Sequence, residues 1–298
     1  MTNKSTSIPK PVNEPILTYL PGSTEKTSLK AKLHELKSQQ IEVPLIIGGE
    51  EIKTGQMGEM RLPHDHQHKL GSFHKAGEKE VKMAIDAALT AWKIWSKTSM
   101  EDRARIFLKA ADLLAGPWRD TINAATMLNM SKNVFQAEVD AACEMIDFFR
   151  FNAWYSQELS KHQPMYSPEG MQNTLELRPL EGFIFAVSPF NFTSIGGNLP
   201  SAPAMMGNVA IWKPASSAVY PAHFIMHLLI EAGLPAGVIN FIPGSGRDVG
   251  PNVMSDSNLA GVHFTGSTAV FQGMWKEVGA NIANYKSYPR IVGETGGK

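Results

Sequence analysis

The chain has 298 residues, of which 43% are hydrophobic and 19% are charged, the usual balance of a soluble globular protein. Lys plus Arg number 28, as do Asp plus Glu, so no net charge would attract nucleic acid or an anionic membrane. The lone Cys143 excludes an internal disulfide, and no apolar run is long enough to span a bilayer. The first residues have neither an apolar signal core nor the Arg-rich pattern of a transit peptide. We therefore expect a cytoplasmic protein whose partners are small molecules or other subunits.

Residues 1–42 are predicted to form an N-terminal arm. Four prolines divide its first part, and a helical pattern follows at 28–39. Two interpretations stay open: the arm lies on the surface of a larger body, or it is a partly disordered tail.

Residues 43–161 are predicted to be mainly helical, after a short hairpin. An apolar run at 43–47, Gly48-Gly49 and the segment 50–53 are typical of such a hairpin. Farther on, three histidines alternate within residues 63–68, which in an extended strand would put them on one side. We weighed a metal site there against a polar edge strand, and the strand is favoured because no further ligand set is evident.

Three helices are then predicted from apolar residues spaced three and four apart. The first carries Val81, Ile85, Ala88, Trp92 and Trp95. The second begins at a capping box made by the residues at 99 and 102, and the third spans 136–154. The cysteine at 143 falls on the apolar face of the third helix. We interpret it as a packed core thiol and not a nucleophile, because burial in apolar surroundings raises a thiol's pKa.

The segment 162–181 is broken by Pro and Gly, and within it residues 173–178 alternate like a strand. From residue 182 onward, short apolar runs alternate with helical stretches. The predicted strands are 183–187, 209–212, 238–242, 261–264 and 290–293. This βαβ pattern predicts an α/β fold, a Rossmann-like parallel sheet with helices on both faces. Ligands of such sheets bind beyond the carboxyl ends of the strands, so the chemistry is expected there.

Polar residues and glycines follow the first three of these strands. Asn191 follows the first, where its amide would suit an oxyanion hole, although an Asn in a loop is more often a turn residue. Lys213 follows the second and suits ribose hydroxyls or phosphate. Gly246 and Gly250 follow the third and allow a ligand to approach the backbone, but their spacing is not the usual dinucleotide fingerprint.

The last two strands are followed by groups suited to phosphate binding and to proton transfer. After the fourth, Phe264, Thr265, Gly266 and Ser267 lead into a helix whose N-terminus would bind a phosphate. After the fifth stands Glu294, whose carboxylate beside glycines suits a general base.

Taken in order, the segments SPFNF, GNVAIWKPA, FTGS and GETGGK resemble the aldehyde dehydrogenase superfamily. The resemblance covers essentially the whole chain from Val43. It implies a bound NAD, with Lys213 on the adenosine ribose and Ser267 at the pyrophosphate. It also implies Asn191 in the oxyanion hole and Glu294 as the base that activates water. The implied cofactor-binding residues further include Ser188, Pro189, Phe190, Gly246, Gly250, Phe264, Thr265 and Gly266. NADP remains possible, because Ser216 leaves room beside the ribose.

Four further segments resemble one branch of that superfamily, the glutamate γ-semialdehyde or 1-pyrroline-5-carboxylate dehydrogenases. They are IIGGEEIKTG, PHDHQHKLGSFHKA, AEVDAACEMIDFFRFNAWY and FTGSTAVFQGMWKEV, the last with Phe271 where many other members have Gly. This implies that Glu138 lines the aldehyde site and that 162–181 is part of an oligomerisation hairpin in a homo-oligomer. The implied activity is NAD-dependent oxidation of L-glutamate γ-semialdehyde to L-glutamate in proline catabolism, through a cysteine thioester.

Two alternatives stay open. One is another semialdehyde dehydrogenase, and a CoA-acylating relative is disfavoured because Glu294 is present. The other is a non-catalytic NAD-binding or assembly module. The resemblance implies that the family's nucleophilic cysteine belongs downstream of Lys298, so we expect a fragment without the catalytic domain. Residues 182–298 would be its βαβ nucleotide-binding core, and the chain alone is predicted to be inactive.

Overall fold

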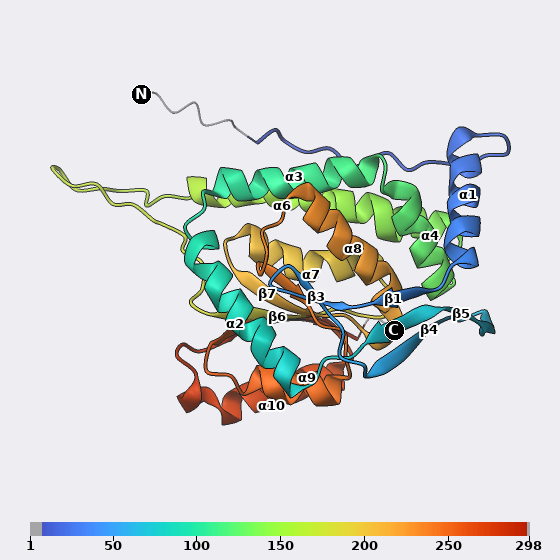
Figure 1. Cartoon of the computed structure of the whole chain (residues 1–298). Helices are drawn as coiled ribbons and strands as arrows, with labels where there is room; N and C mark the ends of the chain where they lie inside the picture. Colours follow the sequence, from blue (N-terminus) through green and yellow to red (C-terminus); the bar gives the residue numbers. More distant parts are fainter. Residues whose placement is uncertain (1–7, 297–298) are drawn as a thin grey trace.

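The computed structural model describes residues 8–296, and a seven-stranded sheet lies at its centre (Figure 1). The strand order is β10-β9-β6-β7-β8-β2-β3. Five of the strands are parallel: β6 Phe183–Val187, β7 Val209–Lys213, β8 Ile239–Phe241, β9 Leu259–Gly266 and β10 Arg290–Thr295. The predicted parallel sheet is therefore confirmed. Residues 1–7 of the predicted arm, and Gly297 and Lys298, lie outside the described residues.

The predicted hairpin is also present, and it extends the sheet at the far edge. Strand β2, Leu45–Ile47, pairs antiparallel with β3, Glu50–Ile52, and Ile46 faces Phe241 of β8. A separate three-stranded ribbon, in the order β1-β5-β4, lies beside it. Its strands are β1 Ile41–Val43, β4 Met57–Leu62 and β5 Asp65–His74.

Helices cover both faces of the sheet (Figure 1). One face carries α2 Glu78–Trp95, α9 Gly246–Met254 and α10 Thr268–Ala280. The other carries α7 Thr193–Met205 and α8 Val219–Ala232, with α3 Met100–Ala115 and α6 Glu144–Lys161 packed outside them. Strands β6, β7 and β8 are almost wholly buried, which is why they appear in the sequence as continuous apolar runs. Among residues 8–296, no helix is long and apolar enough to cross a membrane.

Helix α4, Arg119–Met130, was not predicted. Only three residues, Gly116, Pro117 and Trp118, separate it from the end of α3. Its buried face includes Asn123, Thr126 and Asn129, and these polar residues interrupt the apolar stripe on which the prediction depended.

The third predicted helix is divided by a π-helical turn. Helix α5, Val134–Ala137, continues into the π-helix Glu138–Cys143 and then into α6. The wider turn changes which residues face inward, so Glu138 is fully buried while Val139 is only half-buried.

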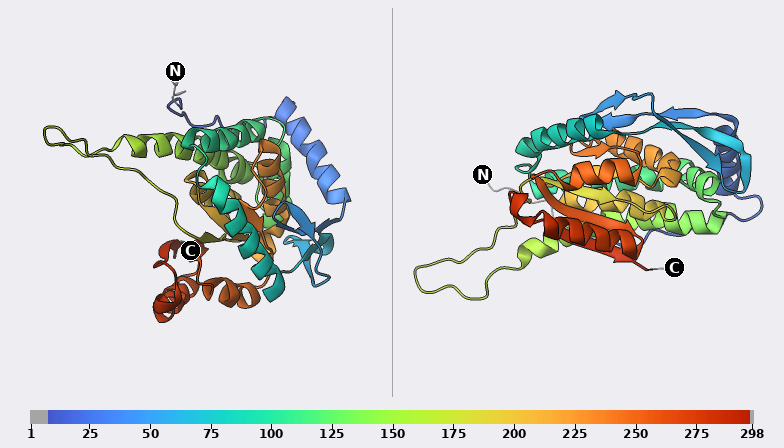
Figure 2. Two further views of the ribbon diagram at one scale, coloured as in Figure 1. Left: turned by 60° about the vertical axis from the view of Figure 1, so that its left-hand side comes forward. Right: turned by 90° about the horizontal axis from the view of Figure 1, so that it is seen from below.

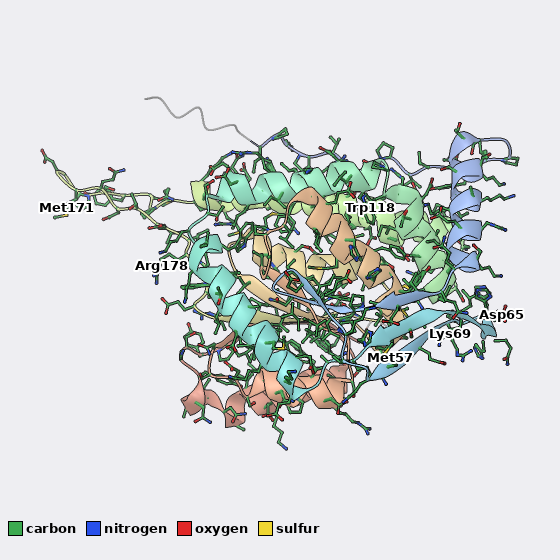
Figure 3. All side chains as sticks on the ribbon, viewed as in Figure 1. Met57, Asp65, Lys69, Trp118, Met171 and Arg178 are labelled. Atoms are coloured by element: carbon green, nitrogen blue, oxygen red, sulfur yellow. The ribbon has the colours of Figure 1, made fainter. Side chains whose placement is uncertain are left out.

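The predicted strand at 173–178 is wrong. Residues 162–182 form an extended loop that projects from the body, with Met171 and Arg178 along it (Figures 1, 2 and 3). The two sides are joined by a side chain, because Gln163 bonds both the backbone N–H and the carbonyl of Leu175, at 2.8 and 3.1 Å. A two-stranded ribbon on its own is marginal, so strand propensity here does not produce a ladder.

The described part of the N-terminal arm lies on the helical layer, in agreement with the surface interpretation. The N–H of Ile8 donates to Gln157 Oε1 of α6 at 2.8 Å, and Glu14 forms ion pairs with Arg119 and Arg150. Helix α1, Thr24–Ser38, then packs against α4. The arm is therefore ordered by charge pairs and not by apolar packing alone.

Candidate functional site

The carboxyl ends of the parallel strands meet at one edge of the sheet. Val187 at the end of β6 stands level with Lys213 of β7 and Phe264 of β9, and Glu294 of β10 pairs with Thr265. The residues predicted from separate segments of the sequence are thus brought together at one edge.

Lys213 is buried there, with 7% of its surface exposed. Its Nζ donates to the carbonyl of Pro214 at 3.1 Å, and no carboxylate among the described residues pairs with it. Burial lowers the pKa of Lys213 to about 8. An ammonium group with only one protein acceptor has donors to spare, which suits hydroxyl or phosphate oxygens of a ligand. Gly246 leaves space beside it, since a Cβ at that position would lie 3.9 Å from the Lys213 Cε.

The loop after β6 is pinned to β7 through Ser188. The Ser188 Oγ accepts from the indole of Trp212 at 2.9 Å, and its carbonyl accepts from the N–H of Ala215. Pro189 is buried and Phe190 is exposed. Asn191 is half-buried, and its amide forms no hydrogen bond with any residue of 8–296, so its donors are available at the sheet edge.

Two helix N-termini face the same edge. Ser267 caps α10 by accepting from the N–H of Val270 at 3.4 Å, and Ser245 caps α9 by accepting from the N–H of Arg247 at 3.2 Å. Gly246 is the first residue of α9, and Gly250 has open space where a Cβ would stand. The free N–H groups of such helix ends attract anions.

The strands β9 and β10 run farther than predicted. Thr265 and Gly266 belong to β9 and Glu294 to β10, whereas the sequence placed all three in the loops that follow. Their mutual hydrogen bonding accounts for the extension, because each strand supplies the other's partners. Glu294 is exposed at this edge, and no acceptor or donor among residues 8–296 engages its carboxylate.

Glu138, predicted to line an aldehyde site, lies elsewhere. Its oxygens form an ion pair with Arg119 and accept from the Leu17 N–H, the Tyr19 hydroxyl and the Asn123 amide, the last three at 2.8 Å. Desolvation would raise the pKa of Glu138, but these hydrogen bonds outweigh it and hold the pKa below its usual value. Glu138 is 0% exposed, and in this structure its oxygens are engaged by the N-terminal arm, by Arg119 and by Asn123.

Glu144, which the sequence reasoning missed, lies close to the sheet edge instead. Its Oε2 accepts from Ser194 Oγ at 3.2 Å, only three residues after Asn191. Desolvation raises the pKa of Glu144. The amine of Lys132 lies near, 4.6 Å from the centre of the Phe192 ring. The helical phase that would have identified Glu144 is hidden by the π-helical turn before it.

Cys143 is buried, but its surroundings are more polar than predicted. Its sulfur lies 3.4 Å from Nη2 of Arg119 and 3.6 Å from Oε1 of Glu138. Desolvation, with the negative charge of Glu138, raises the pKa of the thiol to about 12. A thiol of this kind is a poor nucleophile at neutral pH.

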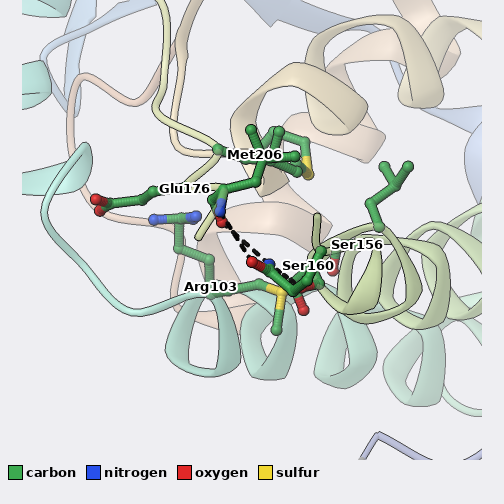
Figure 4. Close-up of a pocket in the computed structure, with 10 residues that line it drawn as sticks. Arg103, Ser156, Ser160, Glu176 and Met206 are labelled. Carbon is green, nitrogen blue, oxygen red and sulfur yellow. Dashed lines mark hydrogen bonds between the residues drawn. The ribbon is translucent and has the colours of Figure 1, made fainter. Parts of the chain in front are cut away.

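A cavity of about 210 Å³ lies at the base of the projecting loop, away from the sheet edge (Figure 4). It is lined in part by Arg103, Ser156, Ser160, Glu176 and Met206. Met206 follows the C-terminus of α7, at the opposite end of that helix from the sheet edge. The Arg103 Nε donates to the carbonyl of Met205 at 2.8 Å, so the guanidinium caps the C-terminus of α7.

The alternating histidines engage separate partners. His64 lies in the turn before β5 and bonds the hydroxyl of Ser131 at 2.7 Å, while His68 bonds the carbonyl of Lys37 at 2.9 Å. Within residues 8–296 no group of three or more His, Cys, Asp or Glu is placed to hold a metal ion.

Comparison with known proteins gives consistent matches. The family model described as aldehyde dehydrogenase matches residues 52–298. The chain is 50% identical over 292 residues to a delta-1-pyrroline-5-carboxylate dehydrogenase of Agaricus bisporus, covering 98% of this chain and 53% of that protein. It is 46% identical over 295 residues to the human mitochondrial protein of that name, covering 99% and 52%.

Solved structures agree. The NAD-bound delta-pyrroline-5-carboxylate dehydrogenase of Mycobacterium tuberculosis superposes with a TM-score of 0.97 at 48% identity, over 99% of this chain and 55% of that one. The NAD-bound Thermus 1-pyrroline-5-carboxylate dehydrogenase has a TM-score of 0.90 at 29% identity, over 98% and 56%. The chain thus spans about half the length of the relatives it matches.

Proposed function

Because the chain belongs to the aldehyde dehydrogenase family, we propose that it is the nucleotide-binding part of an enzyme that oxidises L-glutamate γ-semialdehyde to L-glutamate with NAD. The observation that carries the proposal is that Lys213 and Glu294 lie at the carboxyl ends of β7 and β10, and that Asn191 follows the carboxyl end of β6, at the same edge of the sheet. The names of the similar proteins support the substrate, because they match over almost the entire chain.

The residues at the sheet edge fit a dinucleotide. Lys213 would donate to ribose hydroxyls, and the N-termini of α9, at Gly246, and of α10, at Ser267, would hold the pyrophosphate. Gly250 leaves room on α9. The remaining walls would come from Ser188, Pro189, Phe190, Phe264, Thr265 and Gly266. Bound NAD supplies the hydride acceptor.

The other side chains would act on the aldehyde carbon and on water. The amide of Asn191 would donate to the oxygen that becomes negative in the transition state. Glu294 would take a proton from the water that releases the acid. We propose Glu144, in place of Glu138, as the carboxylate facing the substrate's ammonium group, because it is partly buried beside Ser194.

We further propose that the 298-residue chain binds NAD without turning over. Aldehyde oxidation in this family needs a reactive thiolate, and the only thiol here is Cys143, whose pKa burial raises to about 12.

The domain limits stay proposals at 1–42, 43–161, 162–181 and 182–298. A homo-oligomer in which 162–181 joins two subunits is also proposed, since Leu175, Leu177 and Met171 are exposed there. A cytoplasmic location stays a prediction, and several similar proteins are named mitochondrial.

Calorimetric titration of the chain with NAD and with NADP tests the proposal. We expect NAD to bind, and we expect Lys213→Met to weaken the affinity for NAD at least tenfold. The melting temperature of this variant should not fall, because the substitution removes a buried charge that is costly to desolvate. Lys82→Met, at an exposed position on α2, is the matched control and should bind as the wild type does. Equal NAD affinity in the Lys213 and Lys82 variants would show that the ribose site is wrongly placed.

A second assay separates the enzyme fragment from a non-catalytic module. The chain is incubated with NAD and glutamate γ-semialdehyde, and NADH is followed by absorbance. No turnover is expected from the chain, whereas a longer protein that includes the downstream cysteine should be active and should lose activity on Glu294→Gln. Turnover by the 298-residue chain would contradict the assignment of the nucleophile.

A further inference from the structure

Two histidines lie one turn apart on the outer side of α8. His223 and His227 occupy positions i and i+4, so both side chains project from the same face of the helix. Their ring centres are 4.4 Å apart, and the rings are inclined at 74°. Neither ring forms a hydrogen bond with any residue of 8–296, and the His223 Nδ1 is buried without a partner. A buried polar atom left unpaired calls for an explanation, because such groups are costly.

The pair lines a surface cavity of about 450 Å³. The other walls are Trp118, Phe224, Ile230 and Glu231. The indole of Trp118, which lies between α3 and α4 (Figure 3), donates to Oε2 of Glu231 at 3.0 Å and so holds that carboxylate at the rim. The cavity thus offers two imidazoles with a carboxylate at its rim.

Burial favours the neutral form of both imidazoles. Desolvation, and then the neighbouring His227, lower the pKa of His223 to about 3. Desolvation also lowers the pKa of His227, against the opposing effect of Glu51 on β3. Neutral imidazole is the ligand form, so protons do not compete with a cation at neutral pH.

We propose that His223 and His227 bind a divalent transition metal ion of the zinc type, with water completing its coordination. Imidazole suits zinc, copper and nickel, whereas magnesium and calcium prefer oxygen ligands. Histidines at i and i+4 on a helix are a known arrangement for chelating one zinc ion. With two protein ligands, the ion would exchange with solvent and would not be held permanently. Because it binds the folded chain, the ion raises the melting temperature.

Calorimetric titration of the 298-residue chain with Zn²⁺ and with Mg²⁺ tests the site. We expect one strongest Zn²⁺ site and no response to Mg²⁺. His227→Gln, at a half-buried position, and His223→Ala should each weaken that site at least tenfold and abolish the Zn²⁺-dependent rise in melting temperature. Circular dichroism of each variant without metal shows whether it is folded, and His227→Gln carries the test if His223→Ala is not.

The control is a variant in which the three other clustered histidines, His64, His66 and His68, are changed to Gln. It should keep the Zn²⁺ affinity of the wild type. The proposal is overturned if the wild type does not bind Zn²⁺, if His227→Gln binds as tightly as the wild type, or if only the triple variant loses the site. Quenching of Trp118 fluorescence by Ni²⁺, judged by comparison with Trp118→Phe, gives a second measurement that reports on this cavity alone.

Discussion

Glu138 and Arg119 form an ion pair that is almost completely buried, with 0% and 7% of the respective side chains exposed. Arg119 also pairs with Glu14 and donates to the Pro15 carbonyl, while Glu138 accepts from the Leu17 N–H. The two charges of this buried pair therefore each bind the N-terminal arm and join it to α4 and the π-helix. Removing one partner of such a pair costs more than the pair contributes, because the other charge is left buried.

We therefore expect Glu138→Ala to lower the free energy of unfolding by about 3–5 kcal/mol. Glu158→Gln is the matched control, since Glu158 pairs with Lys161 at the surface and such pairs contribute about 0–1 kcal/mol. Urea unfolding at pH 7 measures both. Similar small losses in the two variants would contradict the importance of the buried pair.

The same pair gives stability a defined pH dependence. The pKa of Glu138 is lower in the fold than its usual 4.5, so its stabilising effect is complete above about pH 4.5 and is lost as the pH falls through the folded value. As the pH falls below about 4.5, the Glu138 carboxylate is protonated more readily in the unfolded chain than in the fold, and the free energy of unfolding decreases. The acid side of a stability–pH curve should be flatter in Glu138→Gln than in the wild type.

At the scale of the elements, the start of β6 depends on a close backbone approach. Gly182 has φ of +125°, and a Cβ there would lie 2.0 Å from the Asn258 carbonyl oxygen, just before β9. Gly170, in the projecting loop, has φ of +74° but nothing within 4 Å of such a Cβ. The two glycines share a backbone conformation that disfavours other residues, and only one of them is also crowded.

Gly182→Ala should therefore lower the free energy of unfolding by about 3 kcal/mol or more, because strand β6 or β9 must shift. Gly170→Ala should cost only about 1 kcal/mol, from its positive φ alone. Urea midpoints of the two variants give the comparison. Equal losses would mean that the β6–β9 contact yields easily.

At the scale of the whole molecule, a compact body contrasts with one projecting segment. Residues 162–178 project from the body (Figure 2) and are exposed throughout. The two sides of the segment are joined by hydrogen bonds of Gln163 to Leu175 and of Asn173 to Tyr166 and Ser167. Apolar side chains are also exposed at the β10 edge of the sheet. They include Val292 on β10 itself and Trp275 on the neighbouring helix α10. Both features are surfaces that the body itself does not cover.

Trypsin should therefore cut the folded chain first after Lys161, where the projecting segment begins, because exposed backbone without ladder bonds enters a protease most readily. Arg178, at the other end of the segment, is followed by Pro179, and trypsin does not cut such a bond. Lys82, exposed but within α2, should stay intact over the same period. Mass spectrometry of the first fragments identifies the site. Early cleavage at Lys82 would show that α2 opens as easily as the loop.

The sequence by itself determined the sheet and its functional edge. Strands such as 183–187 and 209–213 are buried on both faces, so they appear as unbroken apolar runs, and the residues after them must meet where parallel strands end. Asn191, Lys213 and Glu294 were identified as candidates for this reason.

Only the tertiary structure revealed the partners of Glu138 and of Glu144, located α4, and placed the arm. These features depend on partners remote in sequence, since Glu138 accepts hydrogen bonds from Leu17 and Tyr19. The buried face of α4 contains polar residues, and an apolar pattern does not identify such a helix. A π-helical turn also changes the inward face of the chain by a step that a regular period of 3.6 residues does not contain. Local periodicity therefore predicts the elements, while long-range hydrogen bonds and charges determine which polar side chains face the site.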